Sequence, residues 1–314
     1  MVLNVGSRLH KTMTTPAPIP APTPTSTPTP TPTRIALKLA YIGDRYHGFQ
    51  IQPNVRTVEG ELFSSLEKSL IVEDIKEARY SGAARTDRGV HAAGQVVAFD
   101  AGTGFGRLGG SLPRIVNSNL PDDIWVLAYA EVCCDFDPRR NAVSRTYRYF
   151  LHNRDYAVPD MRESSQLFIG THDFSNFTKD RDDTIRTIDE IEIHEHKRDR
   201  FIVIDVRARS FLWNMVRRIV FALEKIGSGE RDSDWIFGLL NPVHRNRNRD
   251  HESGIAPAPA YGLVLREVSY RKSDVSWITD GYSEERMKRA FMGEMIRHST
   301  MAAVYSDYFD QSDL

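Results

Sequence analysis

The distribution of proline sets the limits of what this chain can fold. Residues 14–33, TTPAPIPAPTPTSTPTPTPT, hold eight of the sixteen prolines in the 314-residue sequence. Such a segment is extended and solvated and cannot form a packed core. We assign residues 1–33 to a disordered Pro/Thr-rich tail, or to a start codon placed too far upstream, and expect folded structure from Arg34. A targeting peptide stays open, although no amphipathic arginine-rich helix is evident.

After the tail, strand and helix patterns are mixed. Alternating residues predict strands in RIALKLAYIG (34–43), QVVAFD (95–100), SRTYRYFLHN (144–153), FIVIDVRARSFL (201–212) and, as the final strand, APAYGLVLREVSYR (258–271). Helical patterns are a stripe of Val58, Leu62, Leu66 and Leu70 after the N-cap Thr57, a face of Met215, Val216, Ile219, Val220 and Leu223 ended by Gly227, DSDWIFGLLN (232–241), and an amphipathic segment at 281–306. Because strands and helices do not alternate strictly, an α+β or mixed-sheet architecture is favoured over a doubly wound fold.

Composition excludes few partners. The net charge is −1, so a nucleic-acid-binding protein of this composition would need its basic residues gathered on one face. Cys133 and Cys134 are adjacent and predict reduced core or edge residues rather than a disulfide or a zinc site. No apolar run approaches the ~18 residues that cross a bilayer.

The densest charged cluster lies in a turn within ARYSGAARTDRGVHAAGQVVAFD (78–100). Asp87 is the best single candidate for a catalytic group, because it lies between two arginines just before a buried strand. A turn aspartate that accepts backbone hydrogen bonds is the alternative. Gly89 allows an unusual backbone angle, and His91 and Gln95 add polar groups, which favours chemistry. A nearby arginine would lower the pKa of the aspartate and keep it ionised in a dry pocket.

The segment SRTYRYF interleaves tyrosine and arginine. On a strand, Tyr147 and Tyr149 share one face, while Arg148 points the other way. A tyrosine ring can stack on a flipped base and an arginine can hold a phosphate, although ordinary core tyrosines are the alternative.

The helix with MVRR places Arg217 among mostly apolar neighbours, so this arginine needs an anionic partner. Asp87 is the attractive candidate, and a structural salt bridge elsewhere is the alternative.

Other polar segments are less informative. VHRNRNRDH (243–251) is a basic loop, either solvated surface or a grip on a phosphate backbone. His172 is interpreted as a loop residue, and His194 and His196 as residues of an exposed strand edge, so we predict no metal site. The glycines of GTGFGRLGG do not match a dinucleotide fingerprint.

Together these segments resemble one family, the tRNA pseudouridine synthases of the TruA type. GAARTDRGVHAAGQVVAF resembles the signature G-R-T-D-x-G-V-H-x-x-G-Q-V, with Ala84 where a glycine is usual. RYHGFQIQPNVRTVEGEL resembles the family's opening, and VNSNLPDDIWV, FDPRRNAVSRTYRY, HDFSNF, FLWNMVRRIV and APAYGLVL follow in its order and spacing. The resemblance runs from about residue 34 to 272, and FLWNMVRR is closer to archaeal members.

The resemblance implies roles for particular residues. Asp87 would be the catalytic aspartate, and Tyr147 would stack on the target base. Arg85 and Arg217 would be cations around the aspartate, and Leu263 would form part of the pocket wall.

The resemblance also implies an architecture. Two α/β subdomains, residues 34–140 and 141–272, would share a mixed, largely antiparallel sheet with a basic central cleft. Residues 273–314 would be a helical extension outside the shared pattern.

The implied activity is that of a tRNA pseudouridine synthase acting on uridines 38, 39 and 40 of the anticodon stem-loop. Members act as homodimers, and we expect a cytoplasmic protein without membrane contact. The reaction rejoins uracil to ribose through carbon 5 and needs no redox change, so neither a nucleotide cofactor nor a metal is expected. The carboxylate could attack the anomeric carbon or remove the proton at the adjacent carbon, and both routes stay open.

Two other functions compete with this interpretation. The first is a tRNA-binding protein of the same fold that has lost catalysis and assists tRNA folding. The second is a small-sugar glycosidase, which would require a second catalytic carboxylate ~5–9.5 Å away, and none is obvious near the signature.

Overall fold

The computed structural model describes residues 32–102, 109–180, 182–196, 200–241 and 255–311. Residues 32–314 form one compact unit. The predictions for the Pro/Thr tail, for the basic loop at 243–251 and for most of GTGFGRLGG lie outside the described residues.

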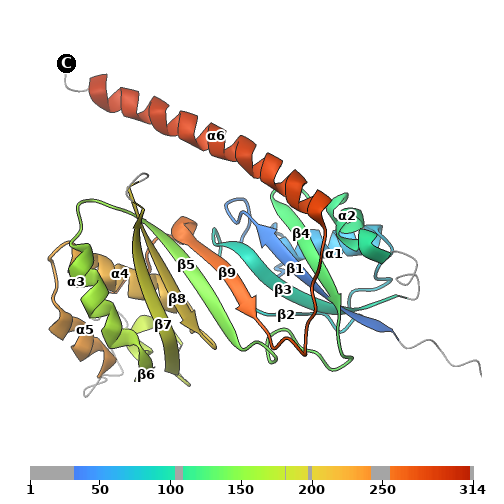
Figure 1. Cartoon of the computed structure of the whole chain (residues 1–314), viewed down its shortest axis with the longest axis horizontal. Coiled ribbons are helices and arrows are strands. Elements are labelled where there is room, and N and C mark those ends of the chain that lie inside the picture. The colour runs from blue at the N-terminus through green and yellow to red at the C-terminus, as the bar shows by residue number, and fades with distance from the viewer. Residues whose placement is uncertain (1–31, 103–108, 181, 197–199, 242–254, 312–314) are drawn as a thin grey trace, which may run out of the picture. The chain divides into compact units, whose positions relative to one another are not determined.

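Within the described ranges, ten strands form one sheet in the order β10-β4-β1-β3-β9-β5-β8-β7-β6, with β2 paired to β3 (Figure 1). The strands are β1 (Thr33–Tyr41), β2 (Ser81–Gly82), β3 (His91–Ala101), β4 (Ile124–Glu131), β5 (Ser144–His152), β6 (Gly170–Asp173), β7 (Ile185–His196), β8 (Phe201–Ala208), β9 (Leu263–Ser269) and β10 (Ile278–Thr279). The predicted strands are confirmed, except that the short β10 follows the one expected to be last.

The α-helices are α1 (Val58–Lys68), α2 (Leu112–Asn117), α3 (Val158–Ser165), α4 (Met215–Gly227), α5 (Ser233–Leu240) and α6 (Gly281–Gln311). Short 3-10 turns are η2 (Gly109–Ser111), η3 (Gln166–Phe168), η4 (Ser175–Phe177) and η5 (Ala260–Gly262). In Figure 1, α1 and α2 lie near the β1–β4 part of the sheet, and α3, α4 and α5 near the β6–β8 part.

The centre of the sheet joins its two parts. Strand β3 pairs with β9 in parallel, with His91 opposite Val264, and every other pair among the described strands is antiparallel. This arrangement confirms the mixed, largely antiparallel α+β sheet. The subdomain boundaries at residues 140 and 272 stay predictions.

Helix α1 begins as its sequence predicts and ends earlier. The Thr57 hydroxyl accepts a hydrogen bond from the Gly60 N–H, which caps the first turn. The inclusion of Leu70 in the apolar stripe was wrong. The helix ends at Lys68, and Leu70 takes a left-handed conformation with a φ of 55°, so that its side chain is exposed and Ile71 turns back into the core.

 The left-handed backbone and the 80% exposure of Leu70 place its side chain outside the core, which the side chains of Leu62 and Leu66 enter.

Helix α4 presents the expected buried face and ends at Gly227, as predicted. Gly227 is the last helical residue, and Gly229, with a φ of 73°, takes the left-handed conformation that follows the helix. Gly227 also serves packing, because a Cβ there would lie 2.6 Å from the sulfur of Met161 and 3.0 Å from the Cβ of Tyr156.

Helix α6 confirms a long C-terminal helix and is attached at its start. The carboxylate of Asp280 accepts hydrogen bonds from Arg114 of α2 and from the N–H and hydroxyl of Ser283. Beyond this anchor, apolar side chains such as Met295 and Tyr305 are exposed. In the described part of the chain, no helix is long and apolar enough to cross a membrane.

Candidate active site

The loop before β3 is held by side chains of β3 itself and of β1. Gln95, which is fully buried, accepts a hydrogen bond from the Ala84 N–H (3.2 Å) and donates to the Ala84 carbonyl (2.7 Å). The next buried contact joins the Tyr41 hydroxyl to the Thr86 hydroxyl at 2.7 Å. These bonds fix Ala84 and Thr86. Asp87, the residue directly after Thr86, therefore has little freedom to move.

Two glycines let the backbone pass close to Asp87. Gly48 has a φ of 103°, and a Cβ there would lie 3.0 Å from the Thr86 carbonyl oxygen and 3.5 Å from the Asp87 carbonyl carbon. Gly89 has a φ of 77°, so the unusual backbone angle predicted at this position is confirmed. The HGF and TDRG segments are therefore packed backbone against backbone.

Asp87 has one partner on each carboxylate oxygen. Its Oδ2 lies 3.7 Å from a guanidinium nitrogen of Arg217, and its Oδ1 accepts a hydrogen bond from the indole N–H of Trp213 at 3.2 Å. The side chain is 32% exposed. The predicted pairing of Arg217 with Asp87 is confirmed, and the carboxylate is open to an incoming molecule.

Burial has the largest effect on the pKa of the Asp87 carboxyl group. Partial burial raises the pKa of Asp87 above its ordinary value, while Arg217 and the Trp213 hydrogen bond act in the opposite direction without cancelling it. The sequence argument expected the arginine to dominate. The structure reverses that order, because the nearest Arg217 nitrogen is 3.7 Å away rather than in a short bidentate pair.

Tyr147 of β5 lies beside this carboxylate. It is 9% exposed, and its ring meets that of Phe211 edge-on, with centroids 5.2 Å apart. Burial raises the pKa of Tyr147 to about 12, with Arg145 lowering it and the charge of Asp87 raising it. Leu263, at the start of β9, is buried and pairs with Tyr149 in the neighbouring β5.

Arg217 is shared between the site and its surroundings. Its Nε donates to the Ala258 carbonyl at 2.6 Å, and one terminal nitrogen donates to the Asn214 side chain at 3.0 Å. Arg217 therefore also ties the start of α4 to the segment that leads into β9, so both alternatives considered for it apply.

Two arginines of the sequence analysis lie differently from what we expected. Arg85 is exposed, and its charge acts on the pKa of Glu59 rather than on that of Asp87. Arg145, one of the two arginines of SRTYRYF that could hold a phosphate, is buried. Its guanidinium donates to the carbonyls of Ala83 (2.8 Å) and Arg139 (3.0 Å), so this arginine holds the loop before Asp87 and is not free to contact a phosphate.

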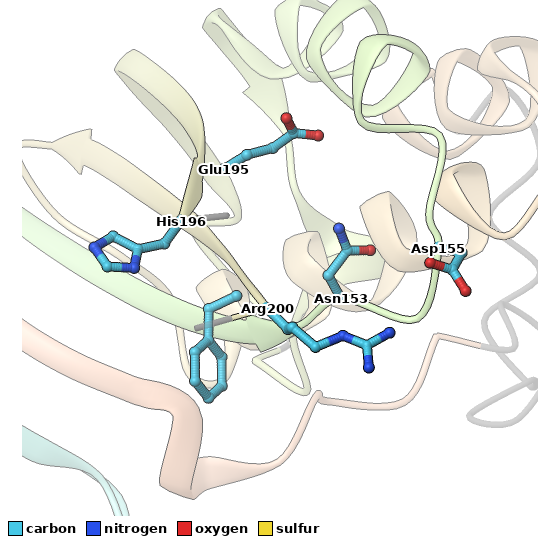
Figure 2. A pocket seen from close by; sticks show the side chains of 6 residues that line it. Asn153, Asp155, Glu195, His196 and Arg200 are labelled. Carbon is cyan, nitrogen blue, oxygen red and sulfur yellow. The ribbon is translucent and has the colours of Figure 1, made fainter. Parts of the chain in front are cut away.

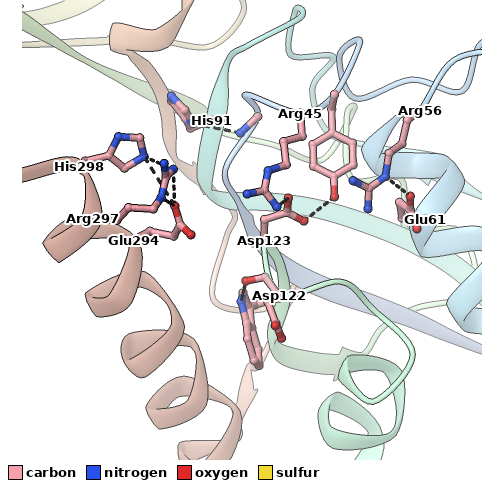
Figure 3. A network of polar contacts seen from close by, with 12 residues as sticks. Arg45, Arg56, Glu61, His91, Asp122, Asp123, Glu294, Arg297 and His298 are labelled. Carbon is pink, nitrogen blue, oxygen red and sulfur yellow. Dashed lines mark hydrogen bonds and ion pairs between the residues drawn. The ribbon is translucent and has the colours of Figure 1, made fainter. Parts of the chain in front are cut away.

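His91 also holds backbone rather than reacting groups. Its Nδ1 accepts from the Gly43 N–H at 3.0 Å, so its Nε2 carries the proton and donates to the Tyr261 carbonyl at 3.0 Å. Figure 3 shows His91 beside a polar network centred on Asp123, which accepts from the Tyr46 hydroxyl. These contacts join the loop after β1 to the start of β3, through His91, and to the start of β4, through Asp123.

Helix α6 passes near the same network. Figure 3 shows Glu294, Arg297 and His298 of this helix together. The hydrogen bond from Arg297 and the more distant charge of Arg45 both act to lower the pKa of Glu294, which places this part of α6 close to the loop after β1.

Trp213 is the residue that the sequence analysis missed. It was quoted only as a letter of FLWNMVRRIV, although it reaches Asp87 directly. The signal in the sequence was the position of Trp213, four residues before Arg217, which needs an anionic partner. Residues at that spacing point the same way near the start of a helix, so both side chains can reach the same carboxylate.

Elsewhere in the described residues there is a cavity of about 290 Å³ and no group of three or more metal-binding side chains arranged as a site. The cavity is lined by Asn153, Asp155, Glu195, His196, Arg200 and Phe201 (Figure 2). None of these is a predicted site residue. His172, interpreted as a loop residue, belongs to β6, where its ring contacts the Ile169 carbonyl.

Comparison with known proteins gives this geometry a context. A family model described as tRNA pseudouridine synthase matches residues 165–271. The tRNA pseudouridine synthase A of Methanosarcina mazei is 49% identical over 276 residues, which cover 87% of this chain and 98% of the relative. The chain belongs to the tRNA pseudouridine synthase A family.

Other members of the tRNA pseudouridine synthase A family agree with this assignment. The Archaeoglobus fulgidus protein is 39% identical over 282 residues, which cover 90% of this chain and 99% of the relative. A solved structure described as an H/ACA RNP bound to a substrate RNA containing 2'-deoxyuridine matches with a TM-score of 0.29, at 13% identity, over 61% of this chain and 53% of that one. That similarity is too low to compare folds. The family resemblance stated from the sequence motifs is therefore confirmed by the relatives alone.

Proposed function

We propose that this protein isomerises uridine to pseudouridine at positions 38, 39 and 40 of the anticodon stem-loop of tRNA, with Asp87 as the catalytic carboxylate. The observation that carries the proposal is the environment of Asp87. It lies on a loop pinned on both sides, half-buried, with one donor on each oxygen and one side open. Family membership at 49% identity supports the tRNA pseudouridine synthase activity.

The chemistry needs an ionised carboxylate and no cofactor. The bond from C1′ of ribose to N1 of uracil breaks, a bond from C1′ to C5 forms, the C5 proton is lost, and N1 gains a proton. The product is an isomer of the substrate. Asp87 can attack C1′ or remove the proton at C2′, and in both routes Arg217 and Trp213 favour the charged form that starts the reaction.

The remaining site residues act around this group. Tyr147 would stack on the target base after it leaves the stem, which offsets part of the few kcal/mol that unstacking costs. Leu263 would form a wall of the pocket beside it. Arg217 would stabilise the charge of Asp87 directly. Arg85, which is exposed, would contact RNA rather than the carboxylate of Asp87.

We propose a homodimer that binds tRNA in the cytoplasm. The support from the structure is α6, whose exposed apolar side chains include Met292, Met295, Ile296 and Tyr305. Exposed apolar side chains concentrated on one helix mark a contact surface. Sedimentation of the full chain tests this: a monomer at concentrations that saturate tRNA would contradict the dimer.

A tritium-release assay tests the activity. Transcribed tRNA carrying [5-³H]uridine should release tritium on incubation with the protein, because C5 loses its hydrogen when it bonds to C1′. Mapping pseudouridine in the product identifies the position. If the protein binds tRNA but releases no tritium, it is the inactive tRNA-folding protein considered as the alternative.

A further inference from the structure

Trp213 lies in the segment between β8 and α4, at the edge of the Asp87 site. Its indole N–H donates to Oδ1 of Asp87 at 3.2 Å, while Arg217, four residues later, faces Oδ2 at 3.7 Å. One short segment therefore supplies the partners of both carboxylate oxygens. We propose that Trp213 is a positioning residue that fixes the orientation of the Asp87 carboxylate and holds it in its ionised form.

Trp213 is itself held in place by a different loop. Its backbone N–H donates to Oδ2 of Asp180 at 3.1 Å, and the ammonium of Lys179 lies over its ring, 5.7 Å from the centroid. Asn214, with a φ of 59°, then turns the chain into α4. The position of the indole is thus set by a hydrogen bond to the backbone of Trp213 and by a cation over its ring.

The exposure of Trp213 argues against a purely structural role. The residue is 50% exposed, whereas a tryptophan that contributes mainly to a core is largely covered. Its N–H is directed at a carboxylate rather than at a backbone carbonyl. By contrast, Trp125 is 3% exposed, and its indole donates to the Asp122 carbonyl, the usual arrangement for a packed tryptophan.

The charged and titratable groups that face Asp87 come from two other elements. Arg217 of α4 favours its ionised form, and Tyr147 of β5 is near enough for the charge of Asp87 to raise its pKa. Since burial works against ionisation, loss of the Trp213 hydrogen bond should shift the pKa of Asp87 further upward. This inference rests on the proposed catalytic role of Asp87.

The first measurement does not require activity. The chain has four tryptophans, so their indole N–H signals in an NMR spectrum can be assigned with single Trp→Phe variants. We expect the Trp213 signal to change with pH as Asp87 titrates, and this change to be absent in Asp87→Asn. A Trp213 signal that does not respond to the ionisation of Asp87 would overturn the proposal.

The second measurement is the rate of tritium release at saturating enzyme, as a function of pH. Trp213→Phe keeps an aromatic ring but loses the N–H, and should lower the rate roughly tenfold, the usual order for a hydrogen bond to a charged group. The acid limb of the profile should move to higher pH, while the dissociation constant for tRNA stays within about twofold. Trp213→His returns an N–H at the same ring position and should restore part of the rate.

Two further variants complete the design. Trp235→Phe is the matched control, because Trp235 lies on α5 beside Arg231 and should leave rate and profile unchanged. If Trp213→Phe does not fold, Asp180→Ala, which removes the backbone anchor, should give a smaller shift in the same direction. Weaker tRNA binding with an unchanged rate in the bound state would mean that Trp213 stacks on RNA, and would also overturn the proposal. If the wild type forms no pseudouridine, the proposed function fails, and the NMR titration still decides the role of Trp213.

Discussion

Two aspartates lie at opposite ends of the same strand and have opposite surroundings. Asp100, near the end of β3, has an 8% exposed side chain and accepts from Arg34 at 2.8 Å and from Arg79 at 2.5 Å. Asp87, just before the start of β3, is 32% exposed, and its arginine is 3.7 Å away. Both aspartates lie on or next to β3, so the difference in their surroundings arises from the residues that contact each carboxylate.

This contrast separates a structural carboxylate, Asp100, from the carboxylate that we propose to be catalytic, Asp87. Arg34 holds several parts of the fold together, since its Nε also donates to the Phe136 carbonyl at 2.6 Å. Short charge-assisted bonds leave Asp100 without capacity for a ligand. The contacts of Asp87 are longer, so they stabilise its charged form less, but they leave its carboxylate accessible to a substrate.

The largest expected effect is the loss of activity in Asp87→Asn. The amide keeps the shape of the side chain but cannot act as nucleophile or base, so tritium release should fall by roughly 10³-fold or more. The variant should fold and bind tRNA with an affinity close to that of the wild type. Multiple turnover by a pure Asp87→Asn sample would remove Asp87 from the mechanism.

The same substitution at the other end of β3 should act on stability instead. Asp100→Asn leaves the buried guanidinium of Arg34 without a counter-ion, which costs about 3–5 kcal/mol in comparable pairs. Thermal unfolding should occur at a clearly lower temperature, while the rate per folded molecule stays unchanged. A stable Asp100→Asn, or an inactive one that is fully folded, would break the comparison.

The sequence was sufficient to predict the ion pair between Arg217 and Asp87, because a charge inside an apolar helical face requires an opposite charge. It was not sufficient for Arg145 and Arg85. Both are arginines in charged or aromatic contexts, yet the guanidinium of Arg145 is hydrogen-bonded to backbone carbonyls, and the charge of Arg85 acts on Glu59. Such outcomes depend on which carbonyls the fold leaves without partners, and this information is not carried by spacing. For the same reason Trp213 could not be recognised before α4 and the Asp87 loop were brought together.

A third test uses pH. Burial raises the pKa of Asp87, and the reaction needs the ionised form, so activity should fall on acidification at a pH above the ordinary aspartate pKa of 3.8. The folded state disfavours the charged form, so the contribution of Asp87 to stability is present below its unfolded pKa and is lost as pH rises through the folded pKa. At neutral pH, Asp87→Asn should therefore melt at the same temperature as the wild type or slightly higher. A clear fall in melting temperature would mean that Asp87 stabilises the fold as Asp100 does.

The smallest expected effect extends the comparison from carboxylates to arginines. Arg139 is exposed, whereas Arg148 is already engaged by both oxygens of Asp205 at 2.8 and 2.6 Å. If Arg139 neutralises a tRNA phosphate, Arg139→Ala should flatten the dependence of log affinity on log salt by roughly 0.7–0.9, the value for one released contact.

Arg148→Ala should leave that salt dependence unchanged, because its charge is already balanced within the sheet by Asp205. Tyr147→Phe should also leave it unchanged, since the ring that stacks is retained, and any loss would then lie in the chemical step. Arg247 of the basic loop, outside the described residues, can be tested in the same titration. An Arg139→Ala slope equal to that of the wild type would remove this arginine from the RNA path. A salt-independent affinity for the wild type and every variant would contradict binding of a polyanion altogether, because each neutralised phosphate must release condensed counterions.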